Sequence, residues 1–292
     1  MQEFDEDSIT DAVIERVVKA PDARVREVSA ALVCHLHAFI REIEPSEAEW
    51  EAGIRFLTET GQMCSATRQE FILLSDTLGV SMLVDAINHR LPGKATQTTV
   101  FGPFYVEPPR FAHGDHIEGK LEGRPMYVGG TVADTHGRPI AGAIVDVWHS
   151  DDQGFYDLQK LEHDPDYSGR GRFETDAQGR FHLWTIRPVA YPIPDDGPVG
   201  KMLAAQGRHP FRPEHIHFMI TAPGHRKLVT HIFAEGDTYL DSDVVFGVKS
   251  SLIRDFDRHA GGHAPDGQAM VGEWFSLVHD FRLAPLDGAT AR

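Results

Sequence analysis

The sequence predicts a mainly β protein with an α-helical N-terminal region, in which the β part forms a β-sandwich. Apolar residues recur at helical spacing from residue 8 to about residue 90. From Leu91-Pro92-Gly93 onward, short strand-like runs alternate with turns that contain Gly or Pro. These runs are irregularly spaced and joined by long loops, which favours a sandwich over βαβ units. We therefore expect two domains, a helical one at 1–95 and a β-sandwich at 96–292.

The helical region is expected to hold several amphipathic helices. The residues able to begin a helix are Ser8 or Thr10, Asp22, Ser46 with Glu49, and Thr67 with Glu70. Gly79 is a natural stop, and a short helix should follow at 80–90. The apolar stripes are wide and the core that such a region can build is small. We therefore expect the region to pack against the second domain, a partner subunit or both.

Five segments of the second region are expected to be strands. They lie at 126–134, 143–149, 180–187, 214–221 and 227–234. The turn signals between them are His136-Gly137, Gln178-Gly179 and Pro223-Gly224. Residues 261–268 are expected to form a loop before a last apolar segment at 274–283.

The composition excludes several classes of function. The net charge of −16 opposes binding to nucleic acid or to anionic lipid. No apolar run has the length of a membrane span, and the acidic N-terminus does not resemble a signal peptide. We expect a cytoplasmic protein.

One strand carries an unusual pair of histidines. The strand at 214–221 places His215 and His217 on one face, and Ile216 and Phe218 on the other. The second face is suited to a core. The first could face solvent, as many such pairs do, but two adjacent imidazoles can also bind a metal.

Two tyrosines are candidates for the same site. Tyr156 and Tyr191 each follow a predicted strand, beside loops rich in Gly or Pro. A tyrosine in such a place is most often an amphipathic residue at the rim of a core. As a ligand, a phenol requires a cation acidic enough to remove its proton, and Fe(III) is such a cation. Zn(II) sites favour His, Cys and carboxylate, and ferrous oxygenases favour two His and one carboxylate.

Four motifs resemble those of the intradiol ring-cleavage dioxygenases. They are Val147-Trp148-His149 with Gly154-Phe155-Tyr156, then Tyr191-Pro192-Ile193-Pro194, then Arg212-Pro213-Glu214-His215-Ile216-His217-Phe218, and Ala222-Pro223-Gly224. The resemblance covers nearly the whole chain and implies the intradiol type of β-sandwich. Within the family, the segments at 99–105 and 239–248 are most similar to the branch that cleaves hydroxyquinol, which is benzene-1,2,4-triol.

The resemblance implies one non-haem Fe(III) per subunit, held by Tyr156, Tyr191, His215 and His217. It also implies that Tyr191 acts as a base. Arg212 would stabilise negative charge on the substrate. His231 stands where catechol-cleaving relatives tend to have Gln, and it can hydrogen-bond at the same place.

The resemblance also implies a substrate pocket. Its expected lining is Leu73, Asp76, Val100, Gly102, Pro103, Phe104, Ile193, Pro194 and Val245. Asp76 could accept a hydrogen bond from a third ring hydroxyl, which favours the triol over catechol. The alternatives are a catechol or chlorocatechol 1,2-dioxygenase, or a non-catalytic binding module with a broken ligand set.

The family implies a homodimer built through the N-terminal helices, often with a phospholipid in an apolar tunnel between them. The apolar stripes of residues 11–44 agree with that arrangement. We expect small aromatic substrates and O2 as the other partners.

Overall fold

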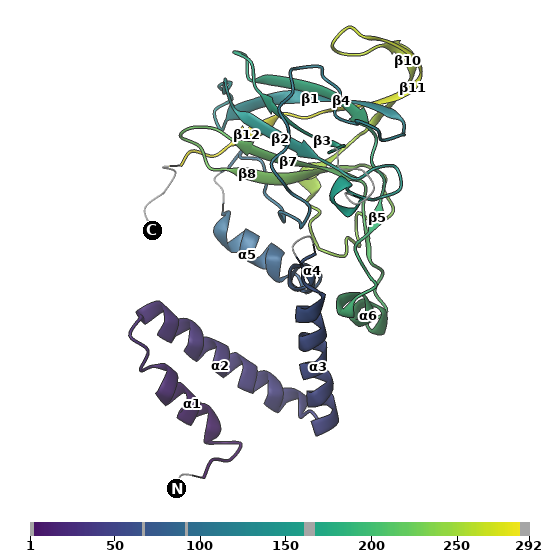
Figure 1. Cartoon of the computed structure of the whole chain (residues 1–292). Helices are drawn as coiled ribbons and strands as arrows, with labels where there is room; N and C mark the ends of the chain where they lie inside the picture. The colour runs from purple at the N-terminus through teal and green to yellow at the C-terminus, as the bar shows by residue number, and fades with distance from the viewer. Residues whose placement is uncertain (1–2, 66–67, 91–92, 161–166, 287–292) are drawn as a thin grey trace. The chain divides into compact units, whose positions relative to one another are not determined.

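The computed structural model describes residues 3–65, 68–90, 93–160 and 167–286. The chain divides into two compact units, Met1–Glu59 and Thr60–Arg292. They are called here the helical unit and the sandwich unit, and each is described by itself (Figure 1). The division into functional domains at 95/96 remains a prediction.

The helical unit contains α1 (Ile9–Val17), α2 (Ala23–Ile43) and the first part of α3 (Glu47–Met63). Two of the predicted caps are confirmed. The Asp22 carboxylate accepts from the Val25 backbone N–H at 2.9 Å, and Ser46 and Glu49 form a reciprocal capping box. Hydrogen bonds from Arg41 to Glu6 and Thr10 tie α2 to α1 and the chain before it.

The sandwich unit is built from two five-stranded sheets and a short two-stranded one (Figure 1). The first sheet has the order β10 (Asp257–His263), β11 (Ala269–Val278), β1 (Pro125–Asp134) and β12 (Phe281–Leu283), with β4 (Arg180–Ile186) also paired to β1. The second has the order β3 (Arg170–Glu174), β2 (Ile144–Trp148), β7 (His215–Thr221), β8 (Leu228–Ala234) and β9 (Ile253–Arg254). The pair β5 (Tyr191–Pro192) and β6 (Phe211–Arg212) lies outside both.

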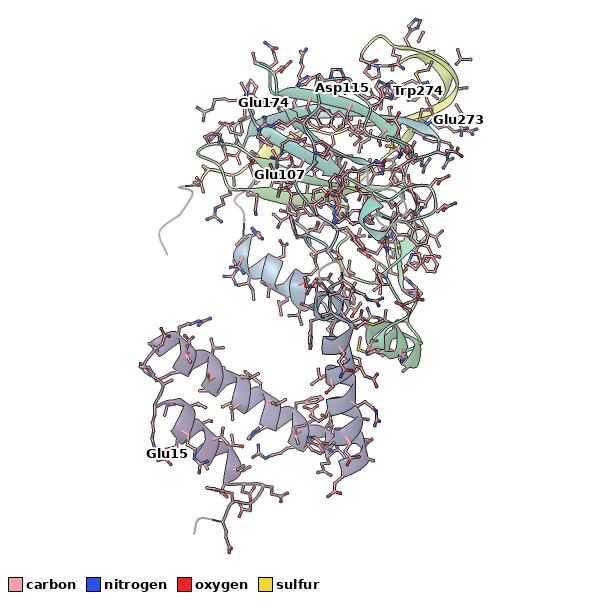
Figure 2. All side chains as sticks on the ribbon, in the orientation of Figure 1. Glu15, Glu107, Asp115, Glu174, Glu273 and Trp274 are labelled. Carbon is pink, nitrogen blue, oxygen red and sulfur yellow. The ribbon has the colours of Figure 1, made fainter. Side chains whose placement is uncertain are left out.

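The core lies between the two sheets. It takes alternate residues from β1, β2, β4, β7 and β8, as the period-two pattern of the sequence requires. Side chains fill the interior of the unit in Figure 2. The acidic residues labelled there as Asp115 and Glu174 are exposed, in keeping with the net charge. The predicted β-sandwich is confirmed.

The five predicted strands are present as β1, β2, β4, β7 and β8. The loop expected at 261–268 was partly wrong, because β10 extends to His263. This strand is mostly exposed and contains Gly261 and Gly262, so its sequence lacks the alternation that marks a half-buried strand. β3 was also missed; three of its five residues are Arg or Glu.

Three helices belong to the sandwich unit: α4 (Glu70–Thr77), α5 (Val80–Asn88) and α6 (Pro198–Ala205). Gly79 separates α4 from α5 with a φ of 73°, as expected for a helix stop. Thr67, half of a predicted capping box, lies outside the described residues. Glu70 has a different role: its buried carboxylate accepts from Arg68 and from the Val199 N–H, which links α4 to α6. Short 3₁₀ turns lie at Asp157–Gln159 and Ser250–Leu252. Within the described ranges, no helix is both long and apolar enough to cross a membrane.

Candidate metal centre and substrate pocket

Strand β7 places its two histidines on the face opposite the core. Ile216 and Phe218 are buried between the sheets, whereas His215 and His217 are buried on the other side of the same strand. The Nε2 atoms of the two imidazoles lie 3.2 Å apart. Alternation along one strand therefore supplies two of the four candidate metal ligands.

Two phenols complete the cluster. The Tyr156 Oη lies 2.8 Å from His217 Nε2, 3.4 Å from His215 Nε2 and 3.3 Å from Tyr191 Oη. Tyr191 is held by the pairing of β5 with β6. Gly154, in the loop before Tyr156, has a φ of 87°, and a Cβ there would lie only 2.5 Å from the Tyr191 Cβ. The structure thus brings together the four side chains predicted to bind the metal.

The ring nitrogens not used in this cluster are hydrogen-bonded. His215 Nδ1 lies 2.7 Å from the Pro213 carbonyl oxygen, to which it can only donate. His217 Nδ1 lies 2.7 Å from His231 Nε2, and His231 Nδ1 lies 2.8 Å from the Thr99 hydroxyl. With the proton of His217 on Nδ1, both Nε2 atoms carry a lone pair that could bind a metal; in this structure, His215 Nε2 accepts from Arg212 Nη1 at 3.2 Å.

His231 is close to the cluster without being suited to it as a ligand. One nitrogen of each of His215, His217 and His231 lies within 4.8 Å of the others, which could indicate a three-histidine site. Both ring nitrogens of His231 are already engaged, however, by His217 and Thr99. The side chain contacts the cluster through its hydrogen bond with His217.

The electrostatics of the pocket favour neutral imidazoles and protonated phenols until a cation enters. Burial, and then the charge of Arg212, hold the pKa of His215 well below its ordinary value. Burial and the neighbouring His215 do the same for His217. Burial and the neighbouring Tyr191 raise the pKa of Tyr156 well above its ordinary value. A cation bound here must be acidic enough to ionise phenols, and Fe(III) meets that requirement.

Arg212 lies beside the four donors and is only 3 % exposed. Its Nη1 lies 3.2 Å from His215 Nε2, and its position in β6 is opposite Tyr191 in β5. Burial alone would lower the pKa of the guanidinium, but the charges of Asp243 and Tyr191 outweigh burial and raise it. Burial raises the pKa of Tyr191, and Arg212 opposes that rise. Arg212 thus makes Tyr191 easier to ionise.

Aromatic rings form the walls around the ligands. Phe104 stacks on Tyr156 with centroids 4.5 Å apart, and Trp148 stacks on His217 at 4.6 Å. The buried Arg170 donates to the Phe104 carbonyl oxygen and pairs with Asp157, the residue after Tyr156. This network holds the backbone of Phe104 and the turn that begins directly after Tyr156.

Four of the predicted pocket residues lie together. Leu73, Val100, Ile193 and Val245 belong to one buried apolar cluster. Gly102 has a φ of 75°, and a Cβ there would lie 3.3 Å from the His217 ring. Pro103 and Pro194 are half-buried next to Gly102 and Ile193 along the chain.

Asp76 is the one acidic residue of this predicted lining. It is 4 % exposed, and it lies on α4 with Leu73. Burial raises the pKa of its carboxyl, while a hydrogen bond from Ser81 and the charge of Arg212 lower it. The charge of Arg212 therefore acts on this carboxylate.

Several residues of the site carry no sequence signal that was used. Thr99, Trp148, Arg170 and Asp243 contact, in that order, His231, His217, Phe104 and Arg212. Thr99, Trp148 and Asp243 lie inside the family-like segments, which could have indicated them. Arg170 lies in a short strand that the alternation pattern missed.

Comparisons with known proteins identify relatives over nearly the whole chain. Residues 100–285 match the family described as "Dioxygenase", and residues 22–96 match "Catechol dioxygenase N terminus". The chain is 53 % identical over 263 residues to a 6-chlorohydroxyquinol 1,2-dioxygenase of Cupriavidus pinatubonensis, covering 90 % of this chain and 95 % of the relative. It is 51 % identical over 280 residues to a hydroxyquinol 1,2-dioxygenase of Nocardioides simplex, covering 94 % of each.

A solved structure is similar over nearly the full length. The hydroxyquinol 1,2-dioxygenase from Pseudomonas putida DLL-E4 superposes with a TM-score of 0.89 at 48 % identity, covering 96 % of this chain and 98 % of the other. The family models, the relatives and this solved structure therefore agree on the family. The chain belongs to the intradiol ring-cleavage dioxygenases, a family of iron-dependent enzymes.

Proposed function

We propose that the protein cleaves hydroxyquinol between its two adjacent hydroxyl-bearing carbons, using O2. The product would be 3-hydroxy-cis,cis-muconate, the enol form of maleylacetate, with both oxygen atoms incorporated. The observation that carries the proposal is the convergence of Tyr156, Tyr191, His215 and His217 in the unit that also contains the buried carboxylate of Asp76. The names of the relatives at 48–53 % identity support the choice of substrate.

We propose Fe(III) as the metal, held by the two phenolates and two imidazoles. The donor set supports this choice, because phenolates prefer a strongly acidic cation and no cysteine is among the donors. When bound, Fe(III) would acidify the substrate hydroxyls and draw electron density from the ring, which makes the ring reactive toward O2. Tyr156 and Tyr191 would each lose a proton on metal binding.

The chain's own residues have distinct roles in this proposal. Tyr191 takes a substrate proton at its Oη, since Arg212 is placed to tune the pKa of that hydroxyl. Arg212 then faces the negative charge that builds on the ring oxygens. The apolar cluster around Leu73 and Val245 excludes water from the ring.

Asp76 supplies the preference for a third hydroxyl. A buried carboxylate with no hydrogen-bond donor from the ring is costly, so a site built for that bond rejects a ring that lacks it. The burial of Asp76 and Leu73 on the same helix, α4, supports a contact of Asp76 with a ring substituent. Catechol or chlorocatechol cleavage is the alternative, and no feature of the pocket favours it.

His231 is proposed to set the tautomer of His217 and not to bind iron. Its hydrogen bonds to His217 and Thr99 support this role. A non-catalytic module would be expected to have lost ligands, whereas the four donors here lie within 3.4 Å of at least one other.

Isotope labelling tests the proposed reaction. The iron-loaded protein should convert hydroxyquinol under ¹⁸O2 to a product two labelled oxygens heavier than the substrate, and its purified form should be red to brown from phenolate-to-iron charge transfer. Product labelled with a single atom, or cleavage outside the two hydroxyl-bearing carbons, would contradict it. A colourless protein containing full iron would remove the tyrosinate site.

We further propose a homodimer that forms through the N-terminal helices in the cytoplasm and can hold a phospholipid between them. The support is the apolar surface of α2, where residues such as Leu32, Leu36 and Phe39 are exposed. A monomeric mass at micromolar concentration would contradict the dimer. Lipid extraction of the purified protein followed by mass spectrometry tests the phospholipid.

A further inference from the structure

We infer that Asp243 is the positioning residue that fixes Arg212 beside the candidate metal ligands and the pocket. The inference rests on the proposed function, because it concerns how Arg212 serves the reaction. Asp243 lies in the loop that follows β8, and it is 5 % exposed. Asp243 lies inside the family-like segment at 239–248, but the sequence does not single it out, since the same loop carries Asp237 and Asp241.

The Asp243 carboxylate accepts four hydrogen bonds. Its Oδ1 accepts from Arg212 Nε at 3.1 Å and from the Val245 backbone N–H at 3.3 Å. Its Oδ2 accepts from Arg212 Nη2 at 3.3 Å and from the Gly247 backbone N–H at 2.9 Å. Both oxygens are thus shared between the guanidinium and the loop's own backbone, which makes the carboxylate the junction of the two.

The nitrogens of the Arg212 guanidinium contact two different partners. Nε and Nη2 form the edge that faces Asp243, and Nη1 lies 3.2 Å from His215 Nε2. A paired edge fixes the plane of the guanidinium, so the Nη1 corner is held in place. Without Asp243, a cation that is only 3 % exposed would be left without its carboxylate partner.

The same carboxylate also shapes the pocket wall. The loop turns tightly at Phe246, whose φ of 59° is left-handed, and the Asp243 side chain accepts from the residues on both sides of that turn. Val245, a predicted pocket residue, is buried in the cluster with Leu73. Asp243 therefore links the placement of Arg212 to that of the substrate-facing loop.

A double-mutant cycle between Asp243 and Arg212 tests the inference. Asp243→Asn replaces one carboxylate oxygen by an NH2 group, which cannot accept a hydrogen bond. At least one of the two hydrogen bonds from Arg212 is therefore lost. We expect kcat to fall about 10- to 100-fold, with a much smaller change in KM, as for loss of an aligned cation. In an Arg212→Met background, the same change should cost less than about 3-fold.

A matched control separates positioning from general folding. The Asp134 carboxylate, at the end of β1, also accepts from two backbone N–H groups and one arginine. Asp134→Asn should leave kcat within about 2-fold of the wild type in both backgrounds. If the losses from Asp243→Asn and Arg212→Met instead multiply, Asp243 acts independently of Arg212 and the inference is overturned.

A second measurement needs neither turnover nor a folded variant. In iron-free wild-type protein labelled with ¹⁵N-arginine, the Arg212 Nε–H should exchange with solvent far more slowly than the Nε–H of exposed arginines. Exchange at the rate of an exposed side chain would contradict the hydrogen bond to Asp243. Because this result is independent of substrate, it separates failure of the inference from failure of the proposed function.

Discussion

The helical unit and the sandwich unit differ in how far their apolar side chains are buried. Across residues 9–43, all of which the structure describes, no residue is buried, and Leu32 on α2 is 63 % exposed. In the sandwich unit, Val145 and Val147 are completely buried between two sheets. The sandwich therefore completes its core with its own chain, whereas the first two helices need something else to cover them.

The contrast suggests that the sandwich unit carries the catalytic site and that the helical unit serves subunit association. All the candidate ligands, Arg212 and the predicted pocket residues lie in the sandwich unit, on strands, on loops and on helix α4. The helical unit offers a surface and no such cluster among its described residues. Changes in the sandwich unit should alter turnover, and changes on α2 should alter association.

The largest effect on turnover is expected from a ligand substitution. Tyr156→Phe removes one phenolate while keeping the ring that stacks on Phe104. We expect kcat/KM to fall by at least about 10³-fold and the charge-transfer band to weaken, because the metal loses a ligand and its balance of charge. Steady-state O2 uptake and visible spectra measure both. The exposed Tyr167, changed to Phe, is the matched control. A Tyr156→Phe enzyme with wild-type activity would place the chemistry elsewhere.

A smaller effect is expected where the chain only orients a ligand. His231→Leu removes the acceptor for the His217 Nδ1–H, so iron affinity should fall about 10- to 100-fold. His231→Gln keeps a group able to accept that bond and should retain most of the affinity. Iron retention during dialysis against a chelator gives the comparison. Equal retention by the Leu variant and the wild type would show that His231 does not orient His217.

The sandwich should also show a pH dependence of stability that the metal centre does not cause. Burial, with the nearby Arg254, lowers the pKa of His279 from 6.5 to about 4. The unfolded chain therefore binds a proton between pH 6.5 and 4 that the folded chain does not, and stability falls as pH drops through that window. Below pH 4, the folded state has lost about 3 kcal/mol of its free energy of unfolding through this one histidine. Denaturant unfolding of His279→Gln should show a shallower fall.

A control makes that measurement specific. His136 is exposed, so His136→Gln should leave the acid limb of the stability curve unchanged. The same acid limb in His279→Gln and the wild type would mean that the buried imidazole titrates normally.

The smallest effect on turnover is expected from the helical unit. Leu32→Glu with Leu36→Glu places two charges on the apolar surface of α2 and should shift the mass in solution from dimer to monomer. The activity per subunit should stay within about 2-fold, because neither residue lies in the sandwich unit. His35→Glu, an exposed position on the same helix, is the control. Light scattering gives the mass in solution, and O2 uptake gives the activity. A double variant that remains a dimer would contradict the proposal that this surface of α2 forms the dimer.

The sequence could predict the elements whose pattern is local. Strand β7 follows from alternation, since Ile216 and Phe218 require a core face and leave His215 and His217 on the other. The caps at Asp22 and Ser46 follow from residues three positions apart. The four-ligand set followed from motifs, and the structure adds that the four side chains meet.

The sequence could not predict partners that the fold brings together from a distance. Thr99 and His231 are 132 positions apart, and Arg170 and Phe104 are 66 apart. Polar residues in loops have no periodicity, so nothing local indicates their partners. Glu70 shows the same limit: its position suggested a helix cap, but its carboxylate accepts from Val199 on α6.

The most direct test of the proposed function compares hydroxyquinol with catechol in wild-type and Asp76→Asn enzyme. The iron-loaded proteins are assayed by O2 uptake, corrected for autoxidation of the triol. We predict a preference of about 100-fold or more for the triol in the wild type, and a large loss of that preference in Asp76→Asn, since the amide accepts the third hydroxyl less well than a carboxylate. A wild-type preference for catechol, or an unchanged ratio in Asp76→Asn, would contradict the role given to Asp76 and to this pocket.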